Sequence, residues 1–294
     1  HPEWDIDTVT LRDGKPYAAF YTADRDEVHW FDPAAAKQYR ALRKALGDVE
    51  VWVASRAENG SRMLIYAGNE ADPGVLYMFD PAAGKLEEVA QYRPALDIRL
   101  LATPKPIQYT ARDGTVIRGY LTLPRGRAAK GLPLIVMPHG GPFGVRDKLA
   151  YNDEVQLLAN RGYAVLQPNY RGSSGYGDEW YQRNGFQSWR TAIGDVTDGG
   201  RWMISTHGVD PAKLSIVGWS YGSTSAIPIM TFLVILALWL VIAMPLTFGG
   251  TVVGRNWAGI PNFPCRISPV PSAIPEKKWY FKRPYLVILG GVMP

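Results

Sequence analysis

Apolar and polar positions alternate in short runs through the first hundred residues, which predicts β-strands joined by tight Asp-Gly and Asn-Gly turns. The pattern also repeats, because the tripeptide Phe-Asp-Pro at 31–33 returns at 79–81, 48 residues later. A repeat of roughly 40–50 residues made of short strands is typical of β-propeller blades; two unrelated hairpins are the alternative. We therefore predict that residues 1–100 are all-β, the last blades of a propeller whose other blades precede His1.

From residue 107 the pattern changes to strands that alternate with helices. A proline-containing linker at 97–106 precedes a hairpin at 107–124. Continuous apolar strands follow at 132–138, 163–170 and 213–219, and helices are predicted near 150–161 and 188–206. This alternation is typical of a parallel sheet with helices on both faces. We therefore predict the first part of an α/β domain over residues 107–226.

An apolar tail follows this domain. Residues 227–248 carry no charge over 22 positions. As a helix they would reach about 33 Å, and the hydrocarbon core of a bilayer is about 30 Å thick. We predict a transmembrane helix that places the chain in a lipid bilayer through 227–248, with Pro245 kinking or ending it. The whole segment 227–294 is then a membrane-type helical tail with a basic loop.

The net charge of +5 comes from this tail alone. Residues 255–294 hold six basic side chains and one acid, whereas basic and acidic residues balance in the rest of the chain. A short basic stretch beside an apolar run is a membrane pattern, so the charge does not indicate a nucleic-acid partner. The single cysteine, Cys265, excludes an internal disulfide.

The candidate chemistry lies in the sequence Gly218-Trp219-Ser220-Tyr221-Gly222, which follows an apolar strand and matches the G-x-S-x-G nucleophile elbow. A serine on a sharp strand-to-helix turn lifts its hydroxyl out of the sheet. The flanking glycines, Gly218 and Gly222, let the backbone pack closely there. Ser220 is therefore the candidate nucleophile.

A glycine-rich turn at the end of an earlier strand complements this elbow. A backbone N–H of Gly140 or Gly141, together with the N–H of Tyr221, would form the oxyanion hole that acyl transfer requires. His139 belongs to the same turn. Tyr170 and Arg171 begin a loop at the end of another strand, and with His139 they are predicted to support the site. No metal site and no cofactor are predicted.

Four segments, PHGGPFG, PNYRGSSGYGDEW, GDVTDGGRWM and IVGWSYG, have the order and spacing of the prolyl oligopeptidase family of serine peptidases. The chain resembles this family over about residues 1–222, and most of all its acylaminoacyl- and dipeptidyl-peptidase branches. The resemblance implies a β-propeller joined to an α/β-hydrolase domain, a peptide substrate and a cytoplasmic location. It also implies that Ser220 is the nucleophile, with Tyr221 and the Gly140/Gly141 turn at the oxyanion.

The chain departs from the family after the serine. The family places an acid and then a histidine downstream, but no Asp or His follows Ser220. His207 lies in a loop that leads into the strand carrying Ser220, so it is predicted at the far end of that strand, about 20 Å away. A serine hydroxyl without a base is a weak nucleophile. We therefore predict that Ser220 is positioned but not activated.

The tail resembles another family. The segments GRNWAGIPNFPCR and IPEKKWY are similar to the nonaspanins, the transmembrane-nine family, over about residues 228–294. This resemblance implies a Golgi or endosomal membrane and brings no catalytic motif. Because the resemblance changes between residues 222 and 228, we predict a chimera of two genes or reads. Three functions stay open: a serine peptidase fragment with a foreign tail, a membrane-trafficking fragment, and a catalytically silent binding module.

Overall fold

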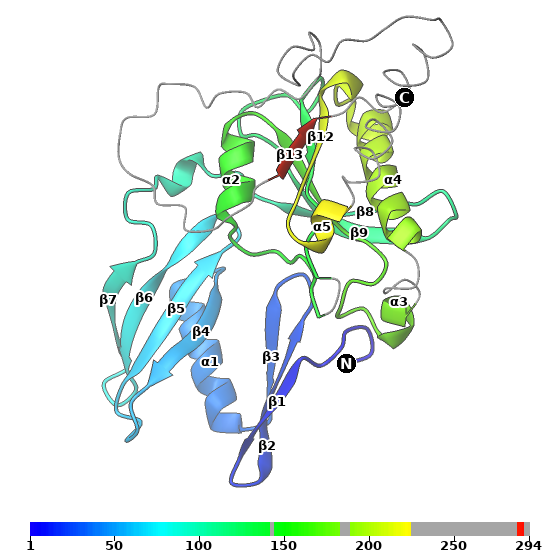
Figure 1. Ribbon diagram of the computed structural model, residues 1–294. Helices are drawn as coiled ribbons and strands as arrows, with labels where there is room; N and C mark the ends of the chain where they lie inside the picture. Colours follow the sequence, from blue (N-terminus) through cyan, green and yellow to red (C-terminus); the bar gives the residue numbers. More distant parts are fainter. Residues whose placement is uncertain (142–143, 183–188, 225–286, 291–294) are drawn as a thin grey trace, which may run out of the picture.

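The computed structural model describes residues 1–141, 144–182, 189–224 and 287–290, which form three β-sheets with flanking helices (Figure 1). The largest sheet has the order β13-β12-β10-β11-β9-β8. β10 pairs in parallel with both β11 and β12, whereas β9 and β13 run antiparallel to their neighbours. The strands are β8 (Lys105–Thr110), β9 (Val116–Thr122), β10 (Leu134–Val136), β11 (Ala164–Asn169), β12 (Leu214–Gly218) and β13 (Val287–Gly290).

Helices α2 (Asp153–Asn160) and α4 (Trp189–His207) lie on opposite sides of this sheet, as Figure 1 shows. Both confirm predicted helices. α2 begins where the Asn152 side chain accepts the N–H groups of Glu154 and Val155, an N-cap. The apolar positions of α4 and the central strands form the main core, which includes Leu134, Val136, Leu166, Val196, Met203 and Leu214. The predicted α/β alternation is therefore present, with a parallel centre in the sheet.

Two smaller antiparallel sheets precede this one. The first has the order β1-β2-β3, with β1 (Thr8–Arg12), β2 (Lys15–Thr22) and β3 (Asp26–Trp30). The second has the order β4-β5-β6-β7, with β4 (Glu50–Arg56), β5 (Met63–Asn69), β6 (Asp72–Asp80) and β7 (Lys85–Gln91). A four-stranded antiparallel sheet with neighbours in chain order has the form of one propeller blade.

The prediction that residues 1–100 are all-β is wrong at helix α1 (Pro33–Leu46). The Asp32 side chain accepts the N–H of Ala35 at 2.7 Å, and Pro33 occupies the first turn, where its missing N–H costs nothing. Leu42 is buried against the second sheet, in a cluster with Val51, Met63, Ile65 and Phe79. The sequence Asp-Pro-Ala-Ala-Ala therefore begins a helix that covers this sheet.

The β2–β3 turn docks on the loop that follows β10. The Leu149 N–H donates to the Asp24 carbonyl at 2.7 Å, and Arg146 Nη1 donates to the Thr22 carbonyl at 3.1 Å. Within the described part of the chain, no helix is long and apolar enough to cross a membrane. The predicted span at 227–248 lies outside the described residues.

Candidate active site

Ser220 stands on a sharp turn between β12 and the short helix α5 (Tyr221–Thr224). Its φ is +52°, and Asp13 is the only other non-glycine residue with a positive φ among those described. The left-handed conformation strains a residue that has a Cβ, and such strain is a recurrent feature of nucleophile elbows. The Gly222 N–H donates to the Trp219 carbonyl at 2.9 Å and closes the turn. The backbone therefore holds Ser220 in the conformation that the motif requires.

Two glycines bring this turn against the loop after β10. A Cβ on Gly222 would lie 2.3 Å from the Pro138 carbonyl oxygen and 2.8 Å from that of His139. A Cβ on Gly140 would lie 3.0 Å from the Trp219 carbonyl oxygen and 3.5 Å from the Ser220 Cβ. The two backbones are therefore in direct contact. The predicted oxyanion turn and the predicted nucleophile turn are brought together.

His139 is buried behind this contact and is fully engaged. Its Nδ1 lies 2.7 Å from the Gly140 carbonyl oxygen, and its Nε2 lies 2.7 Å from Ser173 Oγ. The Tyr170 ring stacks on the imidazole at a centroid distance of 4.4 Å, and the Tyr170 hydroxyl donates to the His139 carbonyl at 2.9 Å. Burial lowers the pKa of His139 to about 4, so the imidazole is neutral near pH 7. His139 and Tyr170 therefore pack against the turn that is predicted to supply the oxyanion hole.

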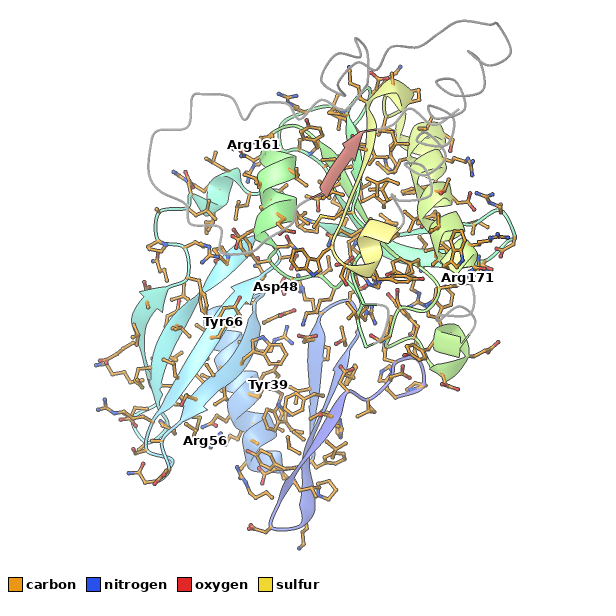
Figure 2. The ribbon with its side chains drawn as sticks, viewed as in Figure 1. Tyr39, Asp48, Arg56, Tyr66, Arg161 and Arg171 are labelled. Atoms are coloured by element: carbon orange, nitrogen blue, oxygen red, sulfur yellow. The ribbon has the colours of Figure 1, made fainter. Side chains whose placement is uncertain are left out.

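Arg171 has another role. It points to α4, as Figure 2 indicates, and its Nη2 pairs with Asp195 Oδ1 at 2.6 Å. Its backbone N–H also donates to Asp195, and its Nη1 pairs with Asp113 at 2.6 Å. The hydrogen bond to the fully buried Asp195 raises the pKa of Arg171, so the guanidinium stays charged. Arg171 fixes the loop after β11 on α4, and Asp195, which the sequence analysis missed, is its counter-ion.

The other described histidines lie elsewhere. His207 ends α4 and packs edge-on against Trp202 at 5.0 Å, before β12 begins, whereas Ser220 follows the end of that strand. His29 packs on Phe31, and His1 stacks on Tyr21. The described residues include no cluster of three His, Cys, Asp or Glu side chains that could hold a metal ion.

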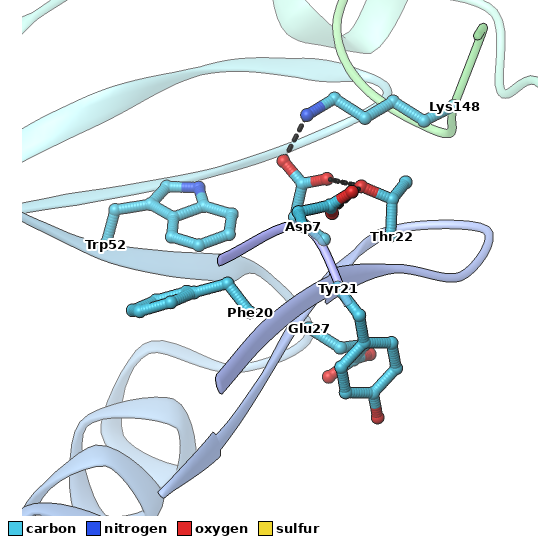
Figure 3. Close-up of a pocket in the computed structure, with 8 residues that line it drawn as sticks. Asp7, Phe20, Tyr21, Thr22, Glu27, Trp52 and Lys148 are labelled. Atoms are coloured by element: carbon cyan, nitrogen blue, oxygen red, sulfur yellow. Dashed lines mark hydrogen bonds and ion pairs between the residues drawn. The ribbon is translucent and has the colours of Figure 1, made fainter. Parts of the chain in front are cut away.

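A cavity of about 300 Å³ lies where the first sheet and β4 meet the loop after β10 (Figure 3). Lys148 forms an ion pair with Asp26 there, and the Thr22 hydroxyl lies 2.9 Å from Asp26 and 3.0 Å from Asp7. The cavity is lined by Asp7, Phe20, Tyr21, Thr22, Asp26, Glu27, Trp52 and Lys148. None of the predicted site residues is in this lining, so the cavity belongs to the junction between the sheets.

A left-handed serine at the end of a central parallel strand, packed on a glycine turn from the neighbouring strand, is the arrangement of an α/β-hydrolase elbow. Comparison with known proteins agrees. The model of the prolyl oligopeptidase family matches residues 149–237, and that of endomembrane protein 70 matches residues 211–294. Both resemblances predicted from the sequence are therefore confirmed, and the two matches overlap across the predicted junction at 222–228.

Individual relatives come from both families. Dipeptidyl aminopeptidase BIII of Pseudoxanthomonas mexicana is 34% identical over 228 residues, which is 74% of this chain and 32% of that protein. Transmembrane 9 superfamily member 1 of Pongo abelii is 29% identical over 173 residues, 56% of this chain and 26% of that protein. The solved acylaminoacyl peptidase of Pyrococcus horikoshii superposes with a TM-score of 0.56 at 20% identity, over 76% of this chain and 34% of that one. The chain thus spans about a third of the length of the first peptidase relative.

Proposed function

We propose that the part of the chain up to Thr224 carries the nucleophile half of a serine peptidase of the prolyl oligopeptidase type. Ser220 Oγ would attack the carbonyl carbon of a peptide bond. The negative charge that develops on the carbonyl oxygen would be met by the N–H of Tyr221 and an N–H of the Gly140/Gly141 turn. The peptide substrate follows from the similarity to dipeptidyl and acylaminoacyl peptidases.

The observation that carries this proposal is the backbone contact between the two turns. Ser220 has a φ of +52°, and Gly140 and Gly222 leave no room for side chains between the turns. Glycine is required at these two positions because any side chain would keep the two backbones apart. Such an approach is what a shared oxyanion site requires.

We further propose that Ser220 reacts slowly in this chain. A serine needs an adjacent base, and the sequence after Ser220 contains no Asp or His. Of the described histidines, His139 lies beside the elbow, but both ring nitrogens are engaged and its pKa of about 4 makes it a weak base. Loss of triad members typically costs on the order of 10⁴–10⁶ in rate.

Labelling with a fluorophosphonate at pH 7.5 tests both proposals. We expect slow labelling of the full chain that disappears in the Ser220→Ala variant. Rapid, stoichiometric labelling would show that a base acts on Ser220. Labelling that persists in Ser220→Ala would show that the nucleophile is another residue.

The match of residues 211–294 to endomembrane protein 70 supports a second proposal, that the tail places the chain in an endomembrane of the Golgi or endosome. Carbonate extraction of membranes from cells that express the full chain tests it. We expect the chain to stay in the membrane pellet. Complete release into the supernatant would contradict a membrane-spanning tail.

A further inference from the structure

Asn169 is the last residue of β11, and neither the motifs nor the proposed function assigns it a role. It is 0% exposed. Its Oδ1 accepts the Asp147 N–H at 2.8 Å, and its Nδ2 donates to the Asp147 carbonyl at 2.9 Å. A backbone N–H can only donate and a carbonyl oxygen can only accept, so these two partners fix the orientation of the amide. The Asn169 side chain therefore holds both backbone groups of one residue.

The same amide also reaches the residue before Asp147. Its Nδ2 donates to the Tyr176 hydroxyl at 2.8 Å, and this hydroxyl accepts a hydrogen bond from Arg146 Nη2 at 2.7 Å. The Gln167 side chain, two residues earlier on the same face of β11, donates to Asp147 Oδ1 at 3.1 Å. The end of β11 therefore holds two consecutive residues of the loop after β10.

The predicted oxyanion turn lies between this anchor and a second one. The Tyr170 hydroxyl donates to the His139 carbonyl at 2.9 Å, immediately before the glycines of the turn. Tyr170 follows Asn169 in the sequence, so neighbouring residues hold the loop at His139 and at Asp147. The glycines have no side chains that could set the path of the turn, and fixing both ends of a short segment leaves it few conformations.

We infer that Asn169 is a positioning residue, whose amide clamps Asp147 and thereby keeps the Gly140/Gly141 turn packed against Ser220. The inference rests on the proposed function only in taking this turn as the oxyanion donor. Loss of the amide would take this partner from the Asp147 N–H and carbonyl and release the loop beyond the turn. A displaced N–H donor stabilises the charge of a transition state less, because the effect depends on distance and direction.

Gln156 on α2 provides a matched control, because it clamps a backbone in the same way at another place. It is 4% exposed, its Oε1 accepts the Ala102 N–H at 2.9 Å, and its Nε2 donates to the carbonyls of Ala102 at 2.8 Å and Glu70 at 3.2 Å. Asn169→Ala and Gln156→Ala therefore remove similar hydrogen bonds from similarly buried sites. A purely structural role predicts equal effects of the two variants, whereas the inference predicts that only Asn169→Ala changes the oxyanion turn.

Magic-angle-spinning NMR of the full chain reports on the turn directly. The sequence contains two His-Gly pairs, His139-Gly140 and His207-Gly208. Histidine labelled with ¹³C at the carbonyl, combined with ¹⁵N-glycine, therefore gives one amide correlation for each pair. The His207→Gln variant removes the second correlation and so assigns both signals.

We expect Asn169→Ala to shift or split the Gly140 signal and Gln156→Ala to leave it unchanged, with the Gly208 signal constant in both variants. An unchanged Gly140 signal in Asn169→Ala, or an equal change in the two variants, would overturn the inference. If Asn169→Ala does not fold, Asn169→Ser, which keeps a polar group at this position, takes its place with the same expectations.

The slow labelling of Ser220 adds a functional readout. We expect Asn169→Ala to reduce its rate roughly tenfold, part of the effect of losing one oxyanion donor, and Gln156→Ala to leave it unchanged. An equal fall in both variants would assign the effect to lost stability and overturn the inference. If the Gly140 signal responds as expected but the unchanged chain is not labelled at Ser220, the proposed nucleophile fails while the role of Asn169 in positioning the turn stands.

Discussion

The cluster around the predicted nucleophile and the junction between the sheets bury polar groups in opposite ways. Around Ser220, His139 has a partner at each ring nitrogen, and Asp195 receives three hydrogen bonds from Arg171. At the junction, Asp147 Oδ2 and Glu50 Oε1 are buried without a hydrogen-bond partner among the described residues. Burial raises the pKa of both carboxyl groups to about 7.

This difference has a physical consequence. In the cluster around Ser220, the pKa of His139, about 4, lies well below neutrality, so this imidazole keeps its charge state and its partners around pH 7. A carboxyl group with a pKa near 7 changes its charge there, and burying that charge is costly when one of its two oxygens has no hydrogen-bond partner. We therefore expect the backbone geometry of the predicted active site to change little near neutral pH, and the docking of the first two sheets on the loop after β10 to weaken as pH rises.

The largest effect is expected from breaking the Arg171–Asp195 pair. Arg171→Met leaves the fully buried Asp195 without its counter-ion, which typically costs 3–5 kcal/mol of unfolding free energy, about the stability of many domains. The exposed pair of Arg99 and Asp97 is the matched control, with similar geometry but little burial, and Arg99→Met should leave the unfolding free energy almost unchanged, because water already solvates both charges. Pulse proteolysis in urea measures both values, and equal losses would contradict the comparison.

A smaller effect is expected from filling the contact between the two turns. Gly222→Ala places a Cβ 2.3 Å from the Pro138 carbonyl oxygen, so the turns must separate, at a cost of about 1–3 kcal/mol. Labelling of Ser220 should be lost with it. Gly194→Ala is the control, because its Cβ would meet nothing within 4 Å and alanine favours the helix. Unchanged labelling of Gly222→Ala would show that the contact is not needed.

The junction should respond to pH. The folded-state pKa of Asp147, about 7, lies above the ordinary value of 3.8, so the folded state binds the extra proton between these values. Its contribution to stability is therefore complete below about pH 4 and is lost as pH rises through 7. Each pKa unit corresponds to about 1.4 kcal/mol.

Asp147→Asn tests this dependence, because the amide carries no charge at any pH. Hydrogen exchange of the β2–β3 turn should accelerate between pH 5 and pH 8 in the unchanged chain, beyond the intrinsic effect of pH. The variant should show a smaller acceleration. The same acceleration in the unchanged chain and in Asp147→Asn would show that another group causes the effect. The Glu50→Gln variant then tests whether that group is Glu50.

The smallest effect is expected at the start of α1. Asp32→Ala removes the N-cap bond to the Ala35 N–H and should cost about 1 kcal/mol. Asp80→Ala removes the equivalent bonds to Ala82 and Ala83, where the repeat forms a turn, and should cost less because no helix depends on it. Circular dichroism of both variants measures the helical content, and a larger loss for Asp80→Ala would contradict the assignment.

Much of the architecture could be predicted from hydrophobic patterning. The strands around β10, β11 and β12 and the helices α2 and α4 have continuous or periodic apolar positions, and the structure places them as expected. α1 was missed because the repeat of Phe-Asp-Pro suggested two propeller blades made of strands alone. The heptapeptides that begin with this tripeptide, FDPAAAK at 31–37 and FDPAAGK at 79–85, differ at one position, Ala36 against Gly84. Gly84 adopts a φ of +63° and turns the chain into β7, whereas alanine continues a helix.

Only those residues of the candidate site that belong to a short sequence motif were predicted. Ser220, Gly140 and Gly222 are recognised by their spacing within short segments. Ser173 and Asp195 were missed because their partners, His139 and Arg171, lie 34 and 24 residues away, and no local pattern encodes such contacts. Both side chains are almost fully buried in the fold, and the burial of a single serine or aspartate cannot be inferred from the sequence alone.

The main proposal is that Ser220 is positioned as a nucleophile but reacts slowly, because no Asp or His follows it in this sequence. The pH dependence of fluorophosphonate labelling, measured on the full chain between pH 6 and 9 with Ser220→Ala as the blank, tests it most directly. We expect the rate to rise steadily with hydroxide, roughly tenfold per pH unit, because only the serine alkoxide reacts when no base assists. A rate that levels off above a pKa near 7 would reveal a titrating base beside Ser220 and would contradict the claim.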